Sequence, residues 1–246
     1  KLGINIQKPS IDLKKLMSNK DSIVSDLTKG IEFLFKKNKI TSFFGRGYIP
    51  EPGKVKITNS SSEKEITTDN ILLASGSNVA PLKNVLIDEN RIVSSTGALS
   101  LESIPKKLIV IGGGYIGLEM GTVWRRLGSE VTVVEYLDRI LPGMDTEIAK
   151  KFKIILEKQG IVFKLKTAVN SAKIVKNHVE LKVSNSDKSE QFDLKADVVL
   201  VATGRIPNTK NIGLEKLGII LTNKGQIDVD EDFATNIPGI YAIGDV

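Results

Sequence analysis

Residues 108–117 read LIVIGGGYIG, an unbroken apolar run followed at once by a cluster of glycines. Four consecutive apolar residues are typical of a strand buried on both faces, and the pattern that continues to about Leu127 predicts a helix. Gly112, Gly114 and Gly117 have the G-x-G-x-x-G spacing of a turn that joins such a strand to such a helix. The alternative interpretation is a glycine-rich turn that binds nothing.

Each of these glycines has a physical role in a phosphate-binding turn. Gly112 allows the tight turn, Gly114 lets the backbone approach a pyrophosphate, and Gly117 lets the helix pack closely on the strand. The N-terminus of the helix adds free N–H groups and the positive end of its dipole, and both favour phosphate. The turn therefore predicts a bound dinucleotide.

An acidic residue closes the next predicted strand. Gly128 ends the helix, the apolar run 131–134 follows, and Glu135 comes 23 residues after Gly112. A carboxylate at this position can accept both ribose hydroxyls of an adenosine and would repel a 2′-phosphate, so the sequence predicts NAD rather than NADP. Arg139 would instead favour the 2′-phosphate of NADP, but we interpret it as a surface or ion-pair residue.

The rest of the chain has a clear order of predicted elements. Residues 11–38 are predicted to be helical, residues 40–66 to form short strands, and residues 161–194 to alternate as strands do. Asp145 is predicted to cap a helix that Gly160 ends. The apolar face predicted for the first helix consists of Ile23, Leu27, Ile31, Leu34 and Phe35.

Two apolar strands of the sequence resemble each other. Residues 69–76, DNILLASG, match residues 197–204, DVVLVATG, at an offset of 128, and each run ends in a hydroxyl residue and a glycine. The simplest account is two similar nucleotide-binding domains, each with such a strand leading to its ligand. Chance similarity of short apolar strands is the alternative.

Composition excludes several classes of function. The 246 residues include no cysteine, so this chain has no disulfide, no Cys-based metal centre and no thiol nucleophile. Only six of the 35 basic residues are Arg and aromatics make up 5%, which predicts a solvated lysine-rich surface rather than a nucleic-acid groove. No apolar run approaches the roughly 18 residues of a membrane helix. No metal site is predicted, and His178, the one histidine, is predicted to be a solvated surface residue.

Together the motifs resemble the dihydrolipoamide dehydrogenases, flavoproteins of the class I pyridine nucleotide-disulfide oxidoreductase family. The resemblance covers essentially the whole chain and is most specific between Glu135 and Asp145. The matching stretches are LTKGIE at 27–32, ASGS at 74–77, VIGGGYIGLE at 110–119, VVEYLDRILPGMD at 133–145, ATGRIPN at 202–208 and YAIGDV at 241–246.

The resemblance implies an α/β fold of the two-dinucleotide-binding-domain flavoprotein type. A Rossmann-like three-layer NAD domain, residues 100–221, would be inserted into a partial FAD-binding domain made of residues 1–99 and a return segment, 222–246. The positions matching NAD contacts in the family are Gly112, Gly113, Gly114, Tyr115, Ile116, Gly117, Leu118, Glu119, Glu135, Val169 and Gly204. The positions matching FAD contacts are Gly47, Ser75, Gly76, Ser77 and Asp245.

Three of these positions carry more detailed expectations. Asp245 would hold the ribityl chain of FAD. Tyr115 would gate the nicotinamide beside the flavin, or would be an exposed residue in the first helical turn. Glu119 would lie near the flavin, where family members pair this acid with a lysine that this chain lacks.

The chain also departs from the family pattern. It has neither the FAD glycine fingerprint with its C-x4-C redox pair nor the dimerisation domain with its His–Glu acid–base pair, so no catalytic residue is assigned to it. It is therefore expected to be about the middle half of such an enzyme and inactive on disulfides by itself.

The intact enzyme implied by the resemblance would pass electrons from dihydrolipoamide through a disulfide and FAD to NAD. It would be a homodimer serving lipoyl domains of 2-oxo acid dehydrogenase complexes, in the cytoplasm if bacterial or the mitochondrial matrix if eukaryotic. The alternatives are a sister NADH-linked flavoprotein disulfide reductase, an NADH oxidase, or a catalytically silent dinucleotide-binding module.

Overall fold

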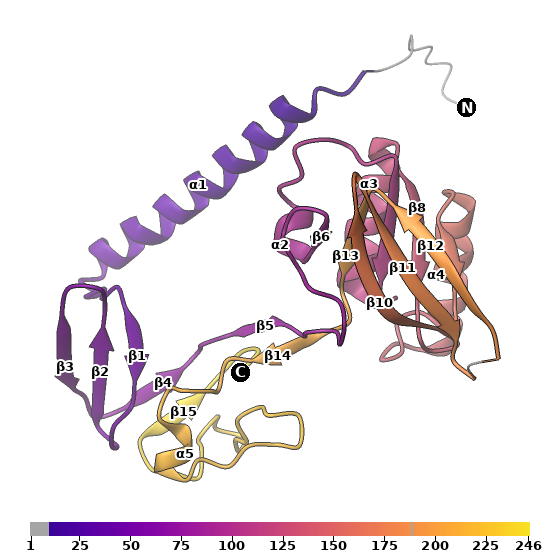
Figure 1. Cartoon of the computed structure of the whole chain (residues 1–246). Helices are drawn as coiled ribbons and strands as arrows, with labels where there is room; N and C mark the ends of the chain where they lie inside the picture. The colour runs from indigo at the N-terminus through magenta and orange to yellow at the C-terminus, as the bar shows by residue number, and fades with distance from the viewer. Residues whose placement is uncertain (1–9, 188) are drawn as a thin grey trace. The chain divides into compact units, whose positions relative to one another are not determined.

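A computed structural model describes residues 10–187 and 189–246 (Figure 1). The chain divides into two compact units, each made of two segments. Unit 1 comprises Lys1–Asp26 and Val79–Gly204, and unit 2 comprises Leu27–Asn78 and Arg205–Val246. The predicted domains are defined by the cofactor that each would bind, so their limits stay predictions. Residues 1–9 of the first predicted domain lie outside the described residues.

Unit 1 is built on a five-stranded parallel sheet, as the α/β prediction requires. Its strands have the order β6-β13-β7-β8-β9, and every neighbouring pair is parallel. The bounds are β6 (Ile92–Val93), β13 (Val198–Val201), β7 (Lys107–Ile111), β8 (Glu130–Val134) and β9 (Val162–Lys164).

Two different layers cover the two faces of this sheet (Figure 1). On β7, Leu108 and Val110 pack with helices α3 (Tyr115–Leu127) and α4 (Thr146–Lys158). The alternate residues, Ile109 and Ile111, pack against an antiparallel sheet on the opposite face. Because side chains alternate along a strand, burial on both faces requires the continuous apolar run seen in the sequence. The three-layer prediction is confirmed.

The antiparallel sheet has the order β10-β11-β12, with β10 (Thr167–Val175), β11 (His178–Asn185) and β12 (Gln191–Ala196). His178 lies on the polar side of β11 as predicted, but its side chain is only 34% exposed rather than fully solvated. Its Nε2 contacts Glu180 Oε1 at 3.1 Å, and the same oxygen pairs with Lys195 Nζ at 2.7 Å. Glu180 therefore contacts an imidazole on its own strand and forms an ion pair with a lysine across the β11–β12 pair.

Unit 2 contains two small sheets around its own core. Strands β1 (Arg46–Tyr48), β2 (Lys54–Thr58) and β3 (Glu63–Thr67) form an antiparallel sheet, and β4 (Ile71–Leu73) pairs in parallel with β15 (Ile240–Ala242). The short helix α5 (Leu214–Leu217) contributes Leu214, which is fully buried with residues of β4 and β15.

Helix α1 (Leu13–Lys37) confirms the helix predicted over residues 11–38. Its predicted apolar face is not buried, and no residue of α1 is buried within the described part of the chain. The side chains of that face are each more than 40% exposed, namely Ile23, Leu27, Ile31, Leu34 and Phe35.

The sequence patterns did not predict several short elements. Helix α2 (Ser95–Ala98) follows β6, and strands β5 (Ser77–Val79) and β14 (Arg205–Pro207) form a two-stranded sheet. Two- to four-residue elements carry no periodicity, so only their partners define them.

Candidate dinucleotide-binding site

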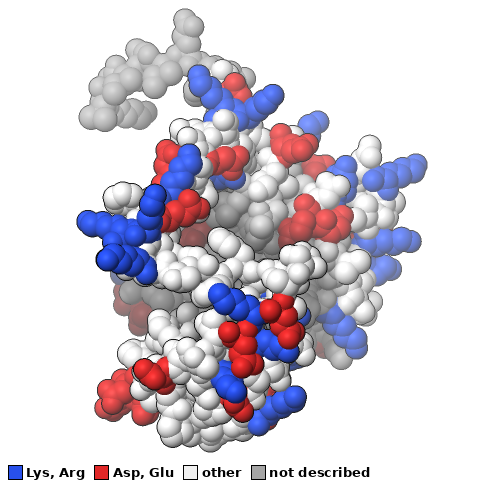
Figure 2. Space-filling view, turned by 90° about the vertical axis from the view of Figure 1, so that its left-hand side faces the viewer, with Lys and Arg blue, Asp and Glu red and all other residues white. Residues whose placement is uncertain are grey.

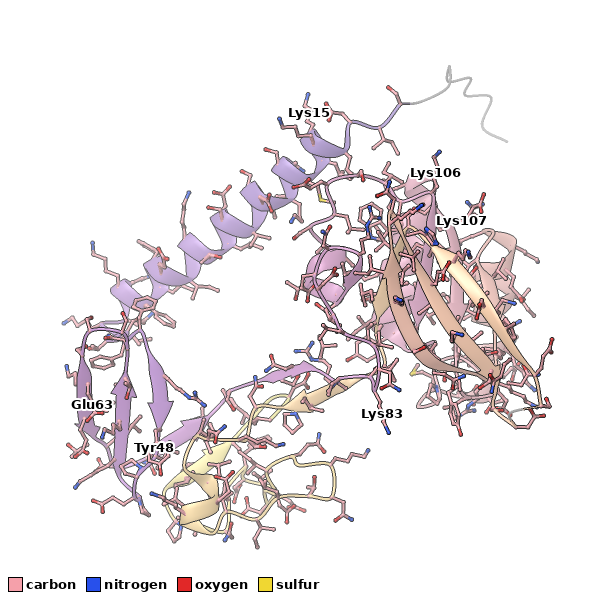
Figure 3. All side chains as sticks on the ribbon, viewed as in Figure 1. Lys15, Tyr48, Glu63, Lys83, Lys106 and Lys107 are labelled. Atoms are coloured by element: carbon pink, nitrogen blue, oxygen red, sulfur yellow. The ribbon has the colours of Figure 1, made fainter. Side chains whose placement is uncertain are left out.

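The glycine turn lies at the carboxyl edge of the parallel sheet, where β7 leads into α3. Lys106 and Lys107 mark the opposite end, where β7 begins (Figure 3). Gly112 has φ +110°, and a Cβ placed there would be 2.3 Å from the carbonyl oxygen of Ala202 at the end of β13. A Cβ at Gly117 would be 2.3 Å from the carbonyl oxygen of Gly112. Both positions therefore exclude any other residue without a shift of the backbone.

Gly114 differs from these two glycines because a Cβ placed on it would meet no heavy atom within 4 Å. It is the N-cap of α3, a 13-residue helix, and no side chain caps that end. The first turn of α3 thus presents amide groups beside open space. An anion is favoured there by these donors and by the helix dipole.

Glu135, the acid at the end of β8, is hydrogen-bonded to the middle residue of the glycine turn. Its carboxylate is 9% exposed; Oε2 accepts from the amide of Gly113 at 2.6 Å, and Oε1 accepts from the amide of Leu137 at 2.8 Å. The carbonyl oxygen of Gly113 accepts from the amide of Leu141 at 2.9 Å. Each carboxylate oxygen keeps a further lone pair and so has the chemical capacity for one more hydrogen bond.

The sequence did not predict the contact between Glu135 and Gly113, because the spacing does not indicate which backbone amide will donate a hydrogen bond to a carboxylate. The only available signal was the third glycine between Gly112 and Gly114. A Cβ at Gly113 would be 3.2 Å from Glu135 Oε2, closer than ordinary van der Waals contact.

Arg139 is engaged by the loop that precedes α4 and by the first residue of that helix. Its Nη1 donates to Thr146 Oγ1 at 2.5 Å, and its Nη2 donates to the carbonyl oxygen of Pro142. Two N–H groups of the half-buried guanidinium are therefore engaged with oxygens of the chain itself.

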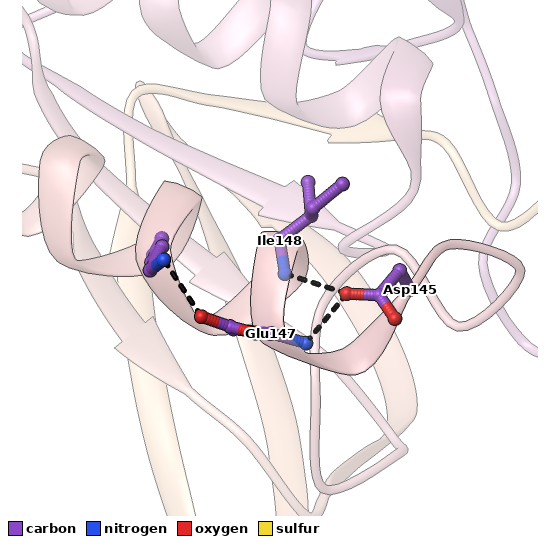
Figure 4. A network of polar contacts seen from close by, with 4 residues as sticks. Asp145, Glu147 and Ile148 are labelled. Atoms are coloured by element: carbon purple, nitrogen blue, oxygen red, sulfur yellow. Dashed lines mark hydrogen bonds and ion pairs between the residues drawn. The ribbon is translucent and has the colours of Figure 1, made fainter.

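The predicted cap of α4 is confirmed. Asp145 Oδ1 accepts from the amides of Glu147 at 2.9 Å and Ile148 at 3.0 Å, as Figure 4 shows. Glu147 Oε1 also pairs with Lys151 Nζ at 2.7 Å. The cap fixes the end of the loop that holds Arg139.

The other positions expected to contact NAD differ in exposure. Tyr115 is 63% exposed in the first turn of α3, and Glu119 is exposed one turn later. Leu118 is only 2% exposed and its amide donates to the carbonyl oxygen of Gly114, so it faces the core. Val169 is half-buried on β10, and Gly204 is exposed beyond β13 with φ +139°. Ile116 is half-buried between the turn and the core.

Unit 2 gathers most of the positions expected to contact FAD around the carboxyl ends of β4 and β15. Because these strands are parallel, Ser75, two residues after β4, and Asp245, three residues after β15, lie at the same edge. Both residues are exposed. A pocket of about 520 Å³ is lined by Gly47 of β1, by β4 and by Ser75.

The charged groups of the described surface are mixed in sign. Figure 2 shows Lys and Arg interspersed with Asp and Glu over the face that it draws. Within residues 10–187 and 189–246, no helix is long and apolar enough to cross a bilayer, and no cluster of His, Cys, Asp and Glu has the make-up of a metal site.

Comparison with known proteins places this arrangement in a family. The pyridine nucleotide-disulphide oxidoreductase profile matches residues 5–246. The chain belongs to this family. Membership explains why a glycine turn and a strand-end acid occur together with the motifs around Ser75 and Asp245.

Several pyridine nucleotide-disulphide oxidoreductases are close relatives of the chain. It is 50% identical over 245 residues to the mitochondrial dihydrolipoyl dehydrogenase of Pisum sativum, covering 99% of the chain and 49% of the relative. Identity to the dihydrolipoamide dehydrogenase of Chaetomium thermophilum is 51%, with the same coverage. Identity to the leghemoglobin reductase of Glycine max is 48%, covering 99% of the chain and 47% of that protein. The chain thus spans about half the length of these relatives.

A solved structure agrees with this placement in the pyridine nucleotide-disulphide oxidoreductases. The HOCl-induced flavoprotein disulfide reductase RclA from Escherichia coli, solved as a Cu(II) complex, superposes with a TM-score of 0.84 at 28% identity. The superposition covers 94% of this chain and 52% of RclA. The two-dinucleotide-binding-domain fold is therefore confirmed.

Proposed function

We propose that the chain binds NAD(H) at the turn between β7 and α3 and forms the NAD-binding part of an FAD- and NAD-dependent dihydrolipoyl dehydrogenase. The observation that carries this proposal is the joint geometry of Gly112, Gly117 and Glu135. Two close backbone approaches shape the turn, and a carboxylate at the adjacent strand end accepts from its middle residue.

The residues present fit a dinucleotide. The pyrophosphate would lie against the open backbone at Gly114, beside the uncapped amides of α3. Glu135 would accept the adenosine ribose hydroxyls, which selects NAD over NADP because a 2′-phosphate would approach a buried carboxylate. The remaining predicted contacts, Tyr115, Ile116, Leu118, Glu119, Val169 and Gly204, belong to the same proposal.

Bound NAD supplies the hydride-accepting ring, and the chain supplies orientation and shielding. Tyr115 is exposed at the first turn of α3, where it can cover or uncover the nicotinamide. Glu119 is exposed one turn further along the same helix, which suits its predicted place near the flavin. Both side chains act here as part of the wall of the site.

Unit 2 fits part of an FAD site. Ser75, Gly76 and Ser77 follow β4, and Asp245 follows β15 at the same edge, with Gly47 lining the adjacent pocket. We propose that the turn contacts FAD and that Asp245 accepts from the ribityl hydroxyls. Residues 1–99 and 222–246 would then be the FAD-binding segments, and residues 100–221 the NAD domain.

The reaction of the whole protein is proposed from its relatives. Dihydrolipoamide would be oxidised through a disulfide and FAD, with NAD as acceptor, in a homodimer that serves lipoyl domains. Relatives named as mitochondrial favour the mitochondrial matrix over the bacterial-type cytoplasmic alternative. A sister flavoprotein disulfide reductase is the second candidate, supported by the likeness to RclA.

Titration of the complete gene product with NADH and with NADPH tests the proposal. We expect NADPH to bind at least about tenfold more weakly than NADH, because Glu135 sets a carboxylate beside the glycine turn. Tighter binding of NADPH would contradict the role of Glu135. Turnover of dihydrolipoamide, compared with that of other disulfides, separates the two candidate reactions.

A further inference from the structure

Asn208, the residue after β14, is hydrogen-bonded to the turn that follows β4. The hydroxyl of Ser75 donates to the carbonyl oxygen of Asn208 at 2.9 Å, and Asn208 Nδ2 donates back to the carbonyl oxygen of Ser75 at 2.9 Å. The amide of Asn208 donates to the carbonyl oxygen of Gly76 at 2.9 Å. Asn78 Nδ2 donates to Asn208 Oδ1 at 2.7 Å. Asn208 thus makes four hydrogen bonds to residues 75–78.

Apolar packing contributes little to the shape of this turn. Ser75 is exposed, Gly76 and Ser77 are half-buried, and none of the three belongs to the hydrophobic core of unit 2. Gly76 has φ +67°, a conformation that other residues rarely adopt. Hydrogen bonds rather than apolar packing therefore determine how the backbone of this turn is presented.

Arg205 makes a second contact, with the last residue of the turn. Arg205 Nε donates to Ser77 Oγ at 2.6 Å, and its Nη2 donates to the carbonyl oxygen of Ser77. This contact holds Ser77, the first residue of β5, whereas Asn208 bonds to Ser75 and Gly76, which precede it, and to Asn78, which follows it. The side-chain amide of Asn208 uses Nδ2 on Ser75 in the turn and Oδ1 on Asn78 in β5.

We propose that Asn208 is a positioning residue for FAD, acting through the turn at Ser75–Ser77. The proposal rests on the proposed function, in which that turn contacts FAD. Asn208 need not touch the cofactor, because it sets the backbone that does. Both a donor and an acceptor are needed on one side chain, which Asn provides and Ala or Asp does not.

The chain offers a matched control in Asn236. Its Oδ1 accepts from the amide of Ile220 at 3.0 Å, and its Nδ2 donates to the carbonyl oxygen of Gly218 at 2.9 Å. Like Asn208, it joins two backbone segments of unit 2 through its side-chain amide. Unlike Asn208, it makes none of its hydrogen bonds to residues 75–78.

The test uses the complete gene product, freed of flavin and titrated with FAD, with fluorescence quenching as the readout. We expect Asn208→Ala to weaken FAD affinity about tenfold and Asn208→Asp to weaken it at least as much. Asp keeps an acceptor for Asn78 but sets a carboxylate against the carbonyl oxygen of Ser75. Asn236→Ala should leave FAD affinity unchanged, and all three variants should bind NADH as the parent does.

The outcomes distinguish the positioning role of Asn208 from the proposed FAD site itself. Equal losses of FAD affinity in Asn208→Ala and Asn236→Ala would overturn the positioning role, since loss of unit 2 stability would explain both. Unchanged FAD affinity in both Asn208 variants would also overturn it. Parent protein that binds NADH but not FAD would overturn the proposed FAD site, and the role of Asn208 with it. If Asn208→Ala does not fold, Asn208→Asp carries the test.

Discussion

The carboxylate of Glu135 and the amide of Gly113 are joined by a 2.6 Å hydrogen bond. The acid predicted to recognise ribose therefore also fixes the middle of the turn predicted to recognise phosphate. Leu141 fixes the other polar group of Gly113 through its own amide. The two halves of the proposed dinucleotide site are consequently a single hydrogen-bonded assembly.

Replacing Glu135 should change both affinity and cofactor choice. In Glu135→Gln the amide has one acceptor oxygen in place of two, so it cannot serve Gly113, Leu137 and ribose together. We expect NADH affinity to fall about tenfold and NADPH affinity to fall less, because the charge that repels a 2′-phosphate is gone. Calorimetric titration with both nucleotides measures this. Glu147→Gln is the control, and an unchanged NADH-to-NADPH ratio in Glu135→Gln would contradict the assignment.

Gly117 should be intolerant of even one methyl group. A Cβ would sit 2.3 Å from the carbonyl oxygen of Gly112, so α3 must move away from β7. We expect Gly117→Ala to lower the free energy of unfolding by about 1–3 kcal/mol and to abolish measurable NADH binding. Gly143→Ala is the control, because open space surrounds that position. Denaturant unfolding and NADH titration of the two variants decide the matter, and parent-like NADH affinity in Gly117→Ala would argue against the turn.

Gly114 should behave in the opposite way to Gly117. No heavy atom lies within 4 Å of a Cβ placed there, so Gly114→Ala should change the free energy of unfolding by less than about 1 kcal/mol. The same methyl group would occupy the space proposed for the pyrophosphate, and NADH affinity should fall about tenfold. Thermal unfolding without ligand and with saturating NADH separates the two effects. A variant with parent-like affinity would show that the phosphate lies elsewhere.

The loop before β6 should stabilise the fold in a pH-dependent manner. Burial raises the pKa of Asp88, but hydrogen bonds from the amides of Ile92, Asn90 and Arg91 outweigh it and hold the pKa below its ordinary 3.8. A carboxylate with a lowered pKa stabilises the fold above its unfolded pKa and loses that effect as pH falls through its folded value.

Asp88→Asn keeps an acceptor oxygen and removes the charge, so it isolates this effect. The variant should be less stable than the parent at neutral pH, and the difference should vanish as pH falls below 3.8. Urea unfolding at a series of pH values measures it, with Asp138→Asn as the exposed control. A difference that persists unchanged into acid would contradict the role of the charge.

Periodicity explains which parts of the fold were predictable. The apolar runs of β7, β8 and β13 identify strands buried on both faces, and the glycine spacing identifies the turn that follows β7. The helix at Leu13–Lys37 followed from its 3.6-residue pattern, but burial of its apolar face did not follow, because burial depends on a partner that the pattern does not contain.

Long-range polar contacts explain what was missed. Ser75 and Asn208 are 133 residues apart, and Gly113 and Glu135 are 22 apart. A side chain that bonds to a distant backbone atom leaves no periodic trace in the sequence. The β5–β14 pair was missed for a different reason, because strands of three residues are too short to show an alternating pattern.

The pairing of Ile71 with Ile240 has a consequence for biosynthesis. Strand β4 leaves the ribosome long before β15, its parallel partner, while most of unit 1 lies in the continuous segment between them. Closing so long a loop is slow, and domains fold as their residues emerge. We therefore expect the segment Val79–Gly204 to fold during synthesis, and we expect the pairing of β4 with β15 to form only after β15 has been made.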